Sequence, residues 1–211
     1  MGMEQIYGAV IEGDMAGVEA GVKRALEDKT PVETILKDGL ISPMDEVGRR
    51  FEAGDFYVPE MLIAARAMKA GVALLRPLFA ETGVKPLGKV IMGTVSGDLH
   101  DIGKNLVGLM LEGAGFQVID VGTDVSPQAF VEAVRKEQPQ LLGLSALLTT
   151  TMPNAGETVK ALKEAGLKEK VKVMVGGAPV TQGFADQIGA DGFAEDAARA
   201  VRKAKVLLGL S

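Results

Sequence analysis

The 211-residue chain contains no cysteine and no tryptophan, and it contains only one histidine. Without cysteine it can form no disulfide, which permits any compartment and makes the cytoplasm the default expectation. A zinc site built by the protein needs about three or four ligands, and soft metals need thiolates. An ordinary transition-metal cage is therefore close to excluded. A metal that arrives inside a macrocycle needs only one axial ligand, as a haem or a corrinoid does. Aromatic residues make up 4% of the chain, which argues mildly against a haem pocket.

Long apolar runs and an excess of basic charge are also missing. No run approaches the roughly 20 apolar residues that span a bilayer, and the first residues lack the basic and apolar regions of a secretory signal. The net charge of −5 argues against a nucleic-acid partner, which normally meets a basic face. The basic residues near the C-terminus recur at helical spacing, which is typical of a solvated helix face. We therefore expect neither a membrane nor a nucleic acid as partner.

Residues 1–87 show helical patterning and no convincing strand, and we predict a bundle of four or five helices there. Asp14 is placed to cap a helix. Thr30-Pro31 and Ser42-Pro43 each join a capping residue to a proline, which is typical of a helix start. The longest helix is predicted from Pro59 to about Phe79, and Pro77 should kink or end it. Such a bundle usually serves packing or interaction.

Residues 88–211 alternate between strand and helix patterns, with short loops between them. This alternation predicts an α/β domain with a doubly wound, five-stranded parallel sheet of the flavodoxin or Rossmann type. Gly83–Gly88 is the natural linker and hinge between the two predicted domains. We predict strands at Lys89–Val95, Gln117–Val121, Gln140–Leu144, Lys172–Val175 and Gly192–Ala194, and helices at Asp101–Glu112, Pro127–Lys136, Asn154–Ala165, Gln182–Ile188 and Asp196–Leu207.

The only histidine, His100, lies on the loop that joins the first predicted strand to the following helix. Loops at this position carry the ligand contacts of open α/β sheets. Asp98 is close enough to bind one ring nitrogen and leave the other free as a ligand, as carboxylates do for metal-bound histidine. Gly97 and Gly103 allow another group to approach the backbone. The alternative is that His100 is merely a polar surface residue.

Two more stretches end neighbouring strands at the same predicted edge of the sheet. Ser145–Thr151 is small and rich in hydroxyl groups, and Gly176-Gly177 lacks side chains altogether. They could leave room for a long group between the loops and the sheet, although threonines beside a strand and a Gly-Gly turn also occur for structural reasons. Neither GxGxxG nor GxxxxGK[ST] is present, so a nicotinamide or triphosphate site is unsupported.

Three elements together carry a resemblance to a known family. Asp98-Leu99-His100-Asp101-Ile102-Gly103 is followed after 41 residues by Ser145-Ala146-Leu147, and after 28 more by Gly176-Gly177. This pattern resembles the DxHxxG…SxL…GG signature of cobalamin-binding domains. The helical and α/β halves together are similar to the cobalamin-binding module of cobalamin-dependent methionine synthase, and more so to the free-standing corrinoid carrier proteins of anaerobic methyltransferase systems.

The resemblance implies a cobalamin or related corrinoid, bound base-off with His100 as the lower axial ligand of cobalt. Asp98 would hold the imidazole, and Thr151 matches a family serine that extends this hydrogen-bond chain. Ser145, Leu147, Gly176 and Gly177 would line a channel for the nucleotide tail. Phe51 and Val58 match residues of a helical cap over the upper corrin face, although Phe51 also suits a bundle core. The complete set implied for the cofactor is Gly97, Asp98, Leu99, His100, Asp101, Ile102, Gly103, Ser145, Leu147, Thr149, Thr151, Gly176, Gly177, Phe51 and Val58.

The function implied is that of a non-catalytic corrinoid subunit in one-carbon metabolism. It would carry a methyl group on cobalt from a substrate-specific methyltransferase to an acceptor methyltransferase that uses tetrahydrofolate or a thiol. A reductive activase would restore oxidised cobalt, and the cap would move away at the hinge. Three alternatives remain: the small subunit of an adenosylcobalamin-dependent mutase, a cobalamin-sensing regulator, and a flavodoxin-like interaction domain without a cofactor. The helical half argues against the first, and the lack of an evident output domain argues against the second.

Overall fold

The computed structural model describes residues 2–210, and the chain divides into two compact units. One unit contains the chain up to Pro86 together with Glu112–Gly115. The other contains Leu87–Leu111 and the chain from Phe116 onward. Among the described residues, no helix is both long enough and apolar enough to cross a membrane.

The first unit is built from helices whose apolar stripes are buried. Asp14 caps α2, as predicted, by accepting a hydrogen bond from the Gly17 N–H at 3.0 Å. The α2 residues Val18 and Val22 are fully buried. The elements are α1 (Gly2–Glu12), α2 (Met15–Glu27), α3 (Val32–Thr34), the π-helix η1 (Ile35–Ile41), α4 (Ser42–Ala53), α5 (Val58–Leu75), the 3₁₀ turn η2 (Arg76–Leu78) and α6 (Phe79–Thr82).

The prediction of a helix start at Ser42-Pro43 is confirmed only in position, because α4 begins at Ser42 with a proline in its first turn but Ser42 does not cap it. The chain is helical without a break from Val32 to Ala53, and Ser42-Pro43 lies where the π-helix η1 passes into α4. A proline inside an α-helix lacks a donor and clashes with the carbonyl four residues earlier. The wider π-turn, in which the Ser42 N–H bonds to the Lys37 carbonyl, accompanies this proline without ending the helix.

Two other proline predictions have different outcomes. Pro31 lies at the N-cap position, one residue before the position predicted for it. Helix α5 ends at Leu75, two residues before Pro77, and continues as the 3₁₀ turn η2. Pro77 therefore ends the helix as expected, earlier than the predicted limit at Phe79.

The second unit is the predicted α/β fold, and each of its strands and α-helices lies within one residue of the expected bounds, whereas a 3₁₀ turn at Lys168–Lys170 was not predicted. Its five strands are all parallel and have the order β2-β1-β3-β4-β5, so the winding reverses between β1 and β3. The elements are β1 (Lys89–Thr94), α7 (Ile102–Gly113), β2 (Gln117–Asp120), α8 (Pro127–Glu137), β3 (Leu141–Ser145), α9 (Pro153–Glu164), the 3₁₀ turn η3 (Lys168–Lys170), β4 (Lys172–Gly176), α10 (Gln182–Ile188), β5 (Gly192–Phe193) and α11 (Ala197–Leu207).

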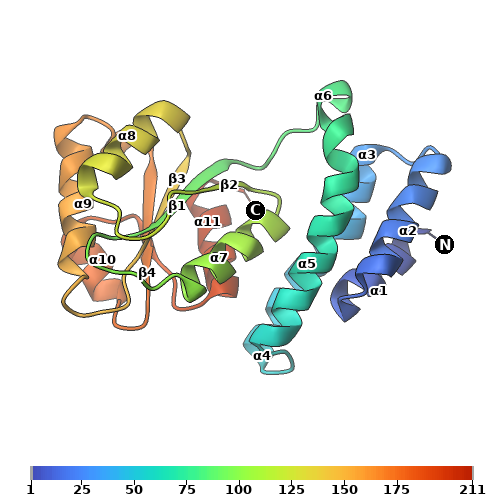
Figure 1. Cartoon of the computed structure of the whole chain (residues 1–211), viewed down its shortest axis with the longest axis horizontal. Helices are drawn as coiled ribbons and strands as arrows, with labels where there is room; N and C mark the ends of the chain where they lie inside the picture. The colour runs from blue at the N-terminus through green and yellow to red at the C-terminus, as the bar shows by residue number, and fades with distance from the viewer. Residues whose placement is uncertain (1, 211) are drawn as a thin grey trace. The chain divides into compact units, whose positions relative to one another are not determined.

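Helices cover both faces of this sheet. Figure 1 shows α8 and α9 on one side of the strands and α7 and α11 on the other. Because both faces are covered, the central strands are apolar nearly throughout: five of the six β1 residues are buried. Phe130 of α8 is fully buried and packs in the same core as Ile91 of β1 and Val159 of α9.

The outer edge of the sheet is anchored by Asp191, which precedes β5. Its Oδ2 atom accepts hydrogen bonds from the Val173 N–H and from the Lys168 ammonium group, both at 2.7 Å. Burial alone would raise the pKa of the Asp191 carboxyl, but these two hydrogen bonds and the charges of Lys168 and Lys172 leave the pKa below its usual value. The edge therefore depends on an ionised carboxylate.

Candidate functional site

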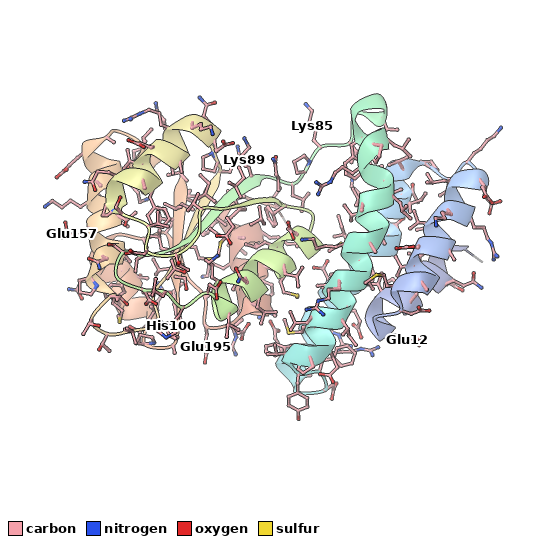
Figure 2. The ribbon with its side chains drawn as sticks, in the orientation of Figure 1. Glu12, Lys85, Lys89, His100, Glu157 and Glu195 are labelled. Carbon is pink, nitrogen blue, oxygen red and sulfur yellow. The ribbon has the colours of Figure 1, made fainter. Side chains whose placement is uncertain are left out.

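The loop between β1 and α7 lies at the carboxyl edge of the sheet, where the winding reverses. Val95 continues β1 by donating its N–H to the Ser145 carbonyl at 3.0 Å. Gly97 then adopts a φ of +78°, which favours glycine, and the chain turns into Asp98. His100 follows two residues later, at the edge of this unit (Figure 2).

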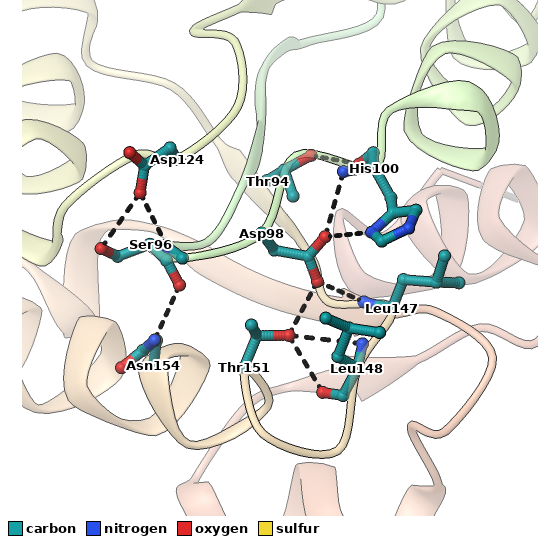
Figure 3. Close-up of polar contacts among 10 residues, drawn as sticks. Thr94, Ser96, Asp98, His100, Asp124, Leu147, Leu148, Thr151 and Asn154 are labelled. Carbon is teal, nitrogen blue, oxygen red and sulfur yellow. Dashed lines mark hydrogen bonds and ion pairs between the residues drawn. The ribbon is translucent and has the colours of Figure 1, made fainter.

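Asp98 is fully buried, and each of its carboxylate oxygens accepts two hydrogen bonds (Figure 3). The Oδ1 atom contacts the backbone N–H of His100 at 3.0 Å and its ring Nδ1 at 2.7 Å. The Oδ2 atom accepts from the Leu147 N–H and from the Thr151 hydroxyl, both at 2.7 Å. The carboxylate thus joins the histidine loop to the loop after β3.

The protonation of this group follows from its contacts. Burial alone would raise the pKa of the Asp98 carboxyl, but the hydrogen bonds from Leu147, Thr151 and His100 hold the pKa well below its usual range. An ionised carboxylate only accepts hydrogen bonds, so the Nδ1 atom of His100 must carry a proton. In the neutral imidazole, the lone pair is then on Nε2. The ring is half-exposed, with 52% of the side chain accessible.

Thr151 has one hydroxyl proton and two acceptors for it. Its Oγ1 atom lies 2.7 Å from Asp98 Oδ2 and 2.9 Å from the Leu148 carbonyl oxygen. The Leu148 N–H in turn donates to Oγ1 at 3.3 Å. Thr151 is buried, so its hydroxyl is held in this position between the carboxylate and the backbone of its own loop.

Three further side chains hold the histidine loop, and the sequence did not reveal them. The buried Thr94 donates its hydroxyl to the His100 carbonyl at 2.9 Å. Asp124 accepts the Gly97 N–H at 2.7 Å, and Asn154 donates to the Ser96 carbonyl at 2.7 Å (Figure 3). Asp124 follows β2, and Asn154 lies in the first turn of α9, which follows β3, so both residues lie at the carboxyl edge of the sheet. The sequence signal that could have revealed Asp124 and Asn154 is that each polar side chain follows a strand next to β1 in the sheet.

Large apolar side chains are exposed around the imidazole. Leu99 is 73% exposed on the histidine loop, and Ile102, the first residue of α7, is 85% exposed. Leu147 and Leu148 are 39% and 41% exposed on the loop after β3. Both loops are joined through Asp98. Exposed apolar groups gathered beside a polar ligand atom are typical of a binding site for a largely apolar molecule. Of these four residues, Leu148 was not among the predicted set.

The glycine pair after β4 has a packing reason of its own. A Cβ atom on Gly177 would lie 1.9 Å from the Ala146 carbonyl oxygen, and its φ of +128° also favours glycine. A Cβ on Gly176 would lie 3.1 Å from the Ala194 carbonyl oxygen. Gly177 therefore allows the chain after β4 to pass directly against the loop after β3, and Gly176, the last residue of β4, lies against the chain that follows β5. Their predicted role beside a nucleotide tail stays a prediction.

The other predicted site residues have mixed positions. Ser145 ends β3 and is half-buried, while Thr149 is exposed in the following turn. Asp101 accepts a hydrogen bond from the Asn105 amide at 3.0 Å, and an added Cβ on Gly103 would meet no atom within 4 Å. Phe51 and Val58 belong to the helical unit, where Phe51 is half-buried in α4 and Val58 is exposed at the start of α5. Their role as a cap stays a prediction.

A parallel doubly wound sheet with its polar cluster at the carboxyl edge defines the class, which is an α/β ligand-binding domain. Two family models, both described as a B12 binding domain, match residues 88–202 and residues 3–76. The chain therefore belongs to the B12-binding corrinoid proteins.

Its relatives agree over nearly the whole chain. It is 47% identical over 207 residues to dimethylamine corrinoid protein 1 of Methanosarcina acetivorans, covering 98% of this chain and 97% of that protein. Among solved structures, it resembles the methanol:cobalamin methyltransferase complex of Methanosarcina barkeri with a TM-score of 0.89 and 32% identity, covering all of this chain and 80% of that one. A cobalamin-binding protein of Desulfitobacterium hafniense has a TM-score of 0.82 and 31% identity, with 97% and 98% covered.

Proposed function

We propose that this chain binds a corrinoid base-off, with the Nε2 atom of His100 as the lower axial ligand of cobalt, and that it carries a methyl group between two methyltransferases. The observation that carries the proposal is the Asp98–His100 contact of 2.7 Å. A fixed Nδ1–H leaves Nε2 as the donor atom, which is the arrangement that ligating histidines adopt.

The residues present fit such a cofactor. A macrocycle already fills the equatorial positions of its metal, so one imidazole completes the lower side. The exposed Leu99, Ile102, Leu147 and Leu148 offer apolar contacts to a flat, largely apolar ring. A corrinoid, when bound, supplies a cobalt atom that accepts a methyl group and gives it up again.

The residues of this chain position the ligand atom. Asp98 keeps the proton on Nδ1 of His100 and fixes the plane of the ring. Thr151 and the Leu147 N–H hold Asp98 ionised from the other side. Nε2 then carries the only lone pair that the ring can offer, so a proton and a metal cannot occupy this atom at the same time.

The partners we propose follow from this role. A carrier needs one methyltransferase to load the methyl group, a second to pass it to tetrahydrofolate or a thiol, and a reductive activase. The relatives support the loading partner, since they include a dimethylamine corrinoid protein and a methanol:cobalamin methyltransferase complex. The identity is 47% to the first and 32% to the second, which favours a methylamine as the first donor to assay.

One histidine in the whole chain makes the ligand directly testable. Tag-free protein labelled with ¹⁵N-histidine is reconstituted with cobalamin, reduced to Co(II), and examined by electron paramagnetic resonance. We expect nitrogen coupling that appears as triplets in unlabelled protein and as doublets in labelled protein, because ¹⁴N and ¹⁵N differ in nuclear spin. His100→Ala should lose the doublets. Triplets that persist after labelling would mean that the cofactor keeps its own base, and the proposed ligand would be wrong.

A further inference from the structure

Lys104, in the first turn of α7, is a buried lysine close to the proposed ligand. Only 2% of its side chain is exposed. Its Nζ atom lies 2.5 Å from Asp120 Oδ2, at the end of β2, and 3.0 Å from Asn105 Oδ1. An ammonium group that is removed from water strongly destabilises the fold unless it is paired. The ammonium group of Lys104 therefore holds the side chains of Asp120 and Asn105 in fixed positions.

Two chains of contacts lead from this ammonium group back to His100. The first is short: the Asn105 side-chain amide donates to Asp101 Oδ2 at 3.0 Å, and the Asn105 N–H donates to the Asp101 carbonyl at 2.7 Å. Asp101 is joined directly to His100 by the peptide bond. This chain fixes the residue that follows the histidine.

The second chain passes through β2 and β1. The Asp120 Oδ1 atom accepts the Gly122 N–H at 2.9 Å, and the Gly122 carbonyl accepts the Thr94 N–H at 2.9 Å. Thr94 in turn donates its hydroxyl to the His100 carbonyl at 2.9 Å. The two chains meet at the peptide group that joins His100 to Asp101, so they form a closed ring of contacts through Lys104.

We propose that Lys104, together with Asp120, is a positioning residue that holds the backbone of His100 in place for metal ligation. Asp98 sets the orientation of the imidazole, and the Lys104–Asp120 pair sets the backbone from which the imidazole projects. The proposal rests on the proposed function, in which His100 is the ligand.

Lys104→Met tests this role, because methionine keeps much of the apolar volume and removes the ammonium group. Lys168→Met is the matched control, since Lys168 is 11% exposed and pairs with Asp191 at 2.7 Å on the far edge of the same sheet. Asp120→Asn removes the other charge of the same ion pair. The Asp120 side chain is 47% exposed, so this variant tests the pair even if Lys104→Met fails to fold.

The first measurement is amide hydrogen exchange in the protein without cofactor. Hydrogen bonds to charged groups contribute substantially to local stability. We therefore expect the amide exchange rates of Gly122 and Asn105 to rise about tenfold or more in Lys104→Met and in Asp120→Asn, and to stay unchanged in Lys168→Met. The second measurement is the ¹⁵N-histidine coupling in Co(II) protein. We expect the fraction of protein with this coupling to fall in both site variants and to stay at the wild-type level in the control.

The outcomes separate this proposal from the function on which it rests. If the wild type lacks histidine coupling, the ligand assignment fails before Lys104 is tested. If the wild type shows the coupling and the two site variants keep it in full, Lys104 is merely structural and the positioning role is overturned. Equal losses in Lys168→Met would overturn it as well, because they would trace the effect to general stability.

Discussion

Replacement of Asp98 by asparagine should destabilise the protein even without a cofactor. The substitution keeps the shape of the side chain, but only one of its two polar atoms can still accept a hydrogen bond. In the wild type, each oxygen accepts one backbone N–H, from His100 at 3.0 Å and from Leu147 at 2.7 Å. Whichever way the amide is turned, one of these N–H groups faces an NH₂ group and loses its acceptor.

The size of the effect follows from this geometry. A buried donor left without an acceptor costs about 1–3 kcal/mol, and hydrogen bonds to a charged acceptor contribute about 1.5–3 kcal/mol. We therefore expect the free energy of unfolding to fall by about 2–4 kcal/mol at pH 7. Urea denaturation followed by far-ultraviolet circular dichroism measures this difference as a lower midpoint at an unchanged slope.

Asp124→Asn is the matched control on the same loop. Only its Oδ1 atom accepts hydrogen bonds, from the Gly97 N–H at 2.7 Å and the Ser96 hydroxyl at 3.4 Å. The amide oxygen of asparagine can take that place, so we expect a loss below about 1 kcal/mol. Equal midpoints for Asp98→Asn and the wild type, or equal losses in the two variants, would refute the reasoning.

The pH dependence of this difference has a definite sign. The pKa of Asp98 is lowered in the folded protein, so the stability that it contributes is present above the unfolded pKa, near about 3.9, and is lost as the pH falls toward the folded pKa. Asparagine does not titrate. The gap between wild type and variant should therefore be constant near neutral pH and should narrow below about pH 4.

The remaining predictions use the same unfolding assay. Gly177→Ala should lower the free energy of unfolding by about 2 kcal/mol or more, because the added Cβ would lie 1.9 Å from a backbone oxygen. Gly166→Ala is the control: its φ is +66°, but an added Cβ would meet no atom within 4 Å, so the loss should be about 1 kcal/mol. Equal losses in the two variants would contradict the close approach at Gly177. Thr151→Ser should stay within about 1 kcal/mol of the wild type and Thr151→Val should lose about 1–2 kcal/mol, because only serine keeps the hydroxyl on Asp98. Asp191→Asn should weaken the wild-type loss of stability below about pH 4, because the pKa of this carboxyl is lowered in the folded state; an unchanged pH profile would exclude that role.

The fold of the α/β unit could be predicted because its signals are local. Each central strand is a short apolar run, and α8 begins at Ser126-Pro127, where the Ser126 hydroxyl accepts the Ala129 N–H at 3.2 Å. Parallel pairing and the carboxyl-edge position of the loops then follow from general rules of sheet topology. The π-helix at Ile35–Ile41 could not be predicted from a local signal. The Ser42-Pro43 pair that follows it is typical of a helix start, so the sequence did not indicate a helix continuing into it.

The site could be predicted only where its contacts are near in sequence. Asp98 and His100 are two residues apart, so their contact follows from the loop itself. The Leu147 N–H that also binds Asp98 is 49 residues away, and its direction depends on the path of an irregular loop. Lys104 carries a charge that surface positions normally hold, and its burial and its pairing with Asp120, 16 residues away, are set by the tertiary fold.

The two carboxylate oxygens of Asp98 bind residues that the ribosome adds at different stages of synthesis. During synthesis, His100 leaves the ribosome soon after Asp98, whereas Leu147 and Thr151 follow 49 and 53 residues later. A nascent chain that ends before these residues contains the imidazole but lacks the groups that hold its carboxylate. Asp98 therefore gains its full set of contacts only when the loop after β3 is present, so a chain truncated before Leu147 lacks both hydrogen bonds to the Oδ2 atom.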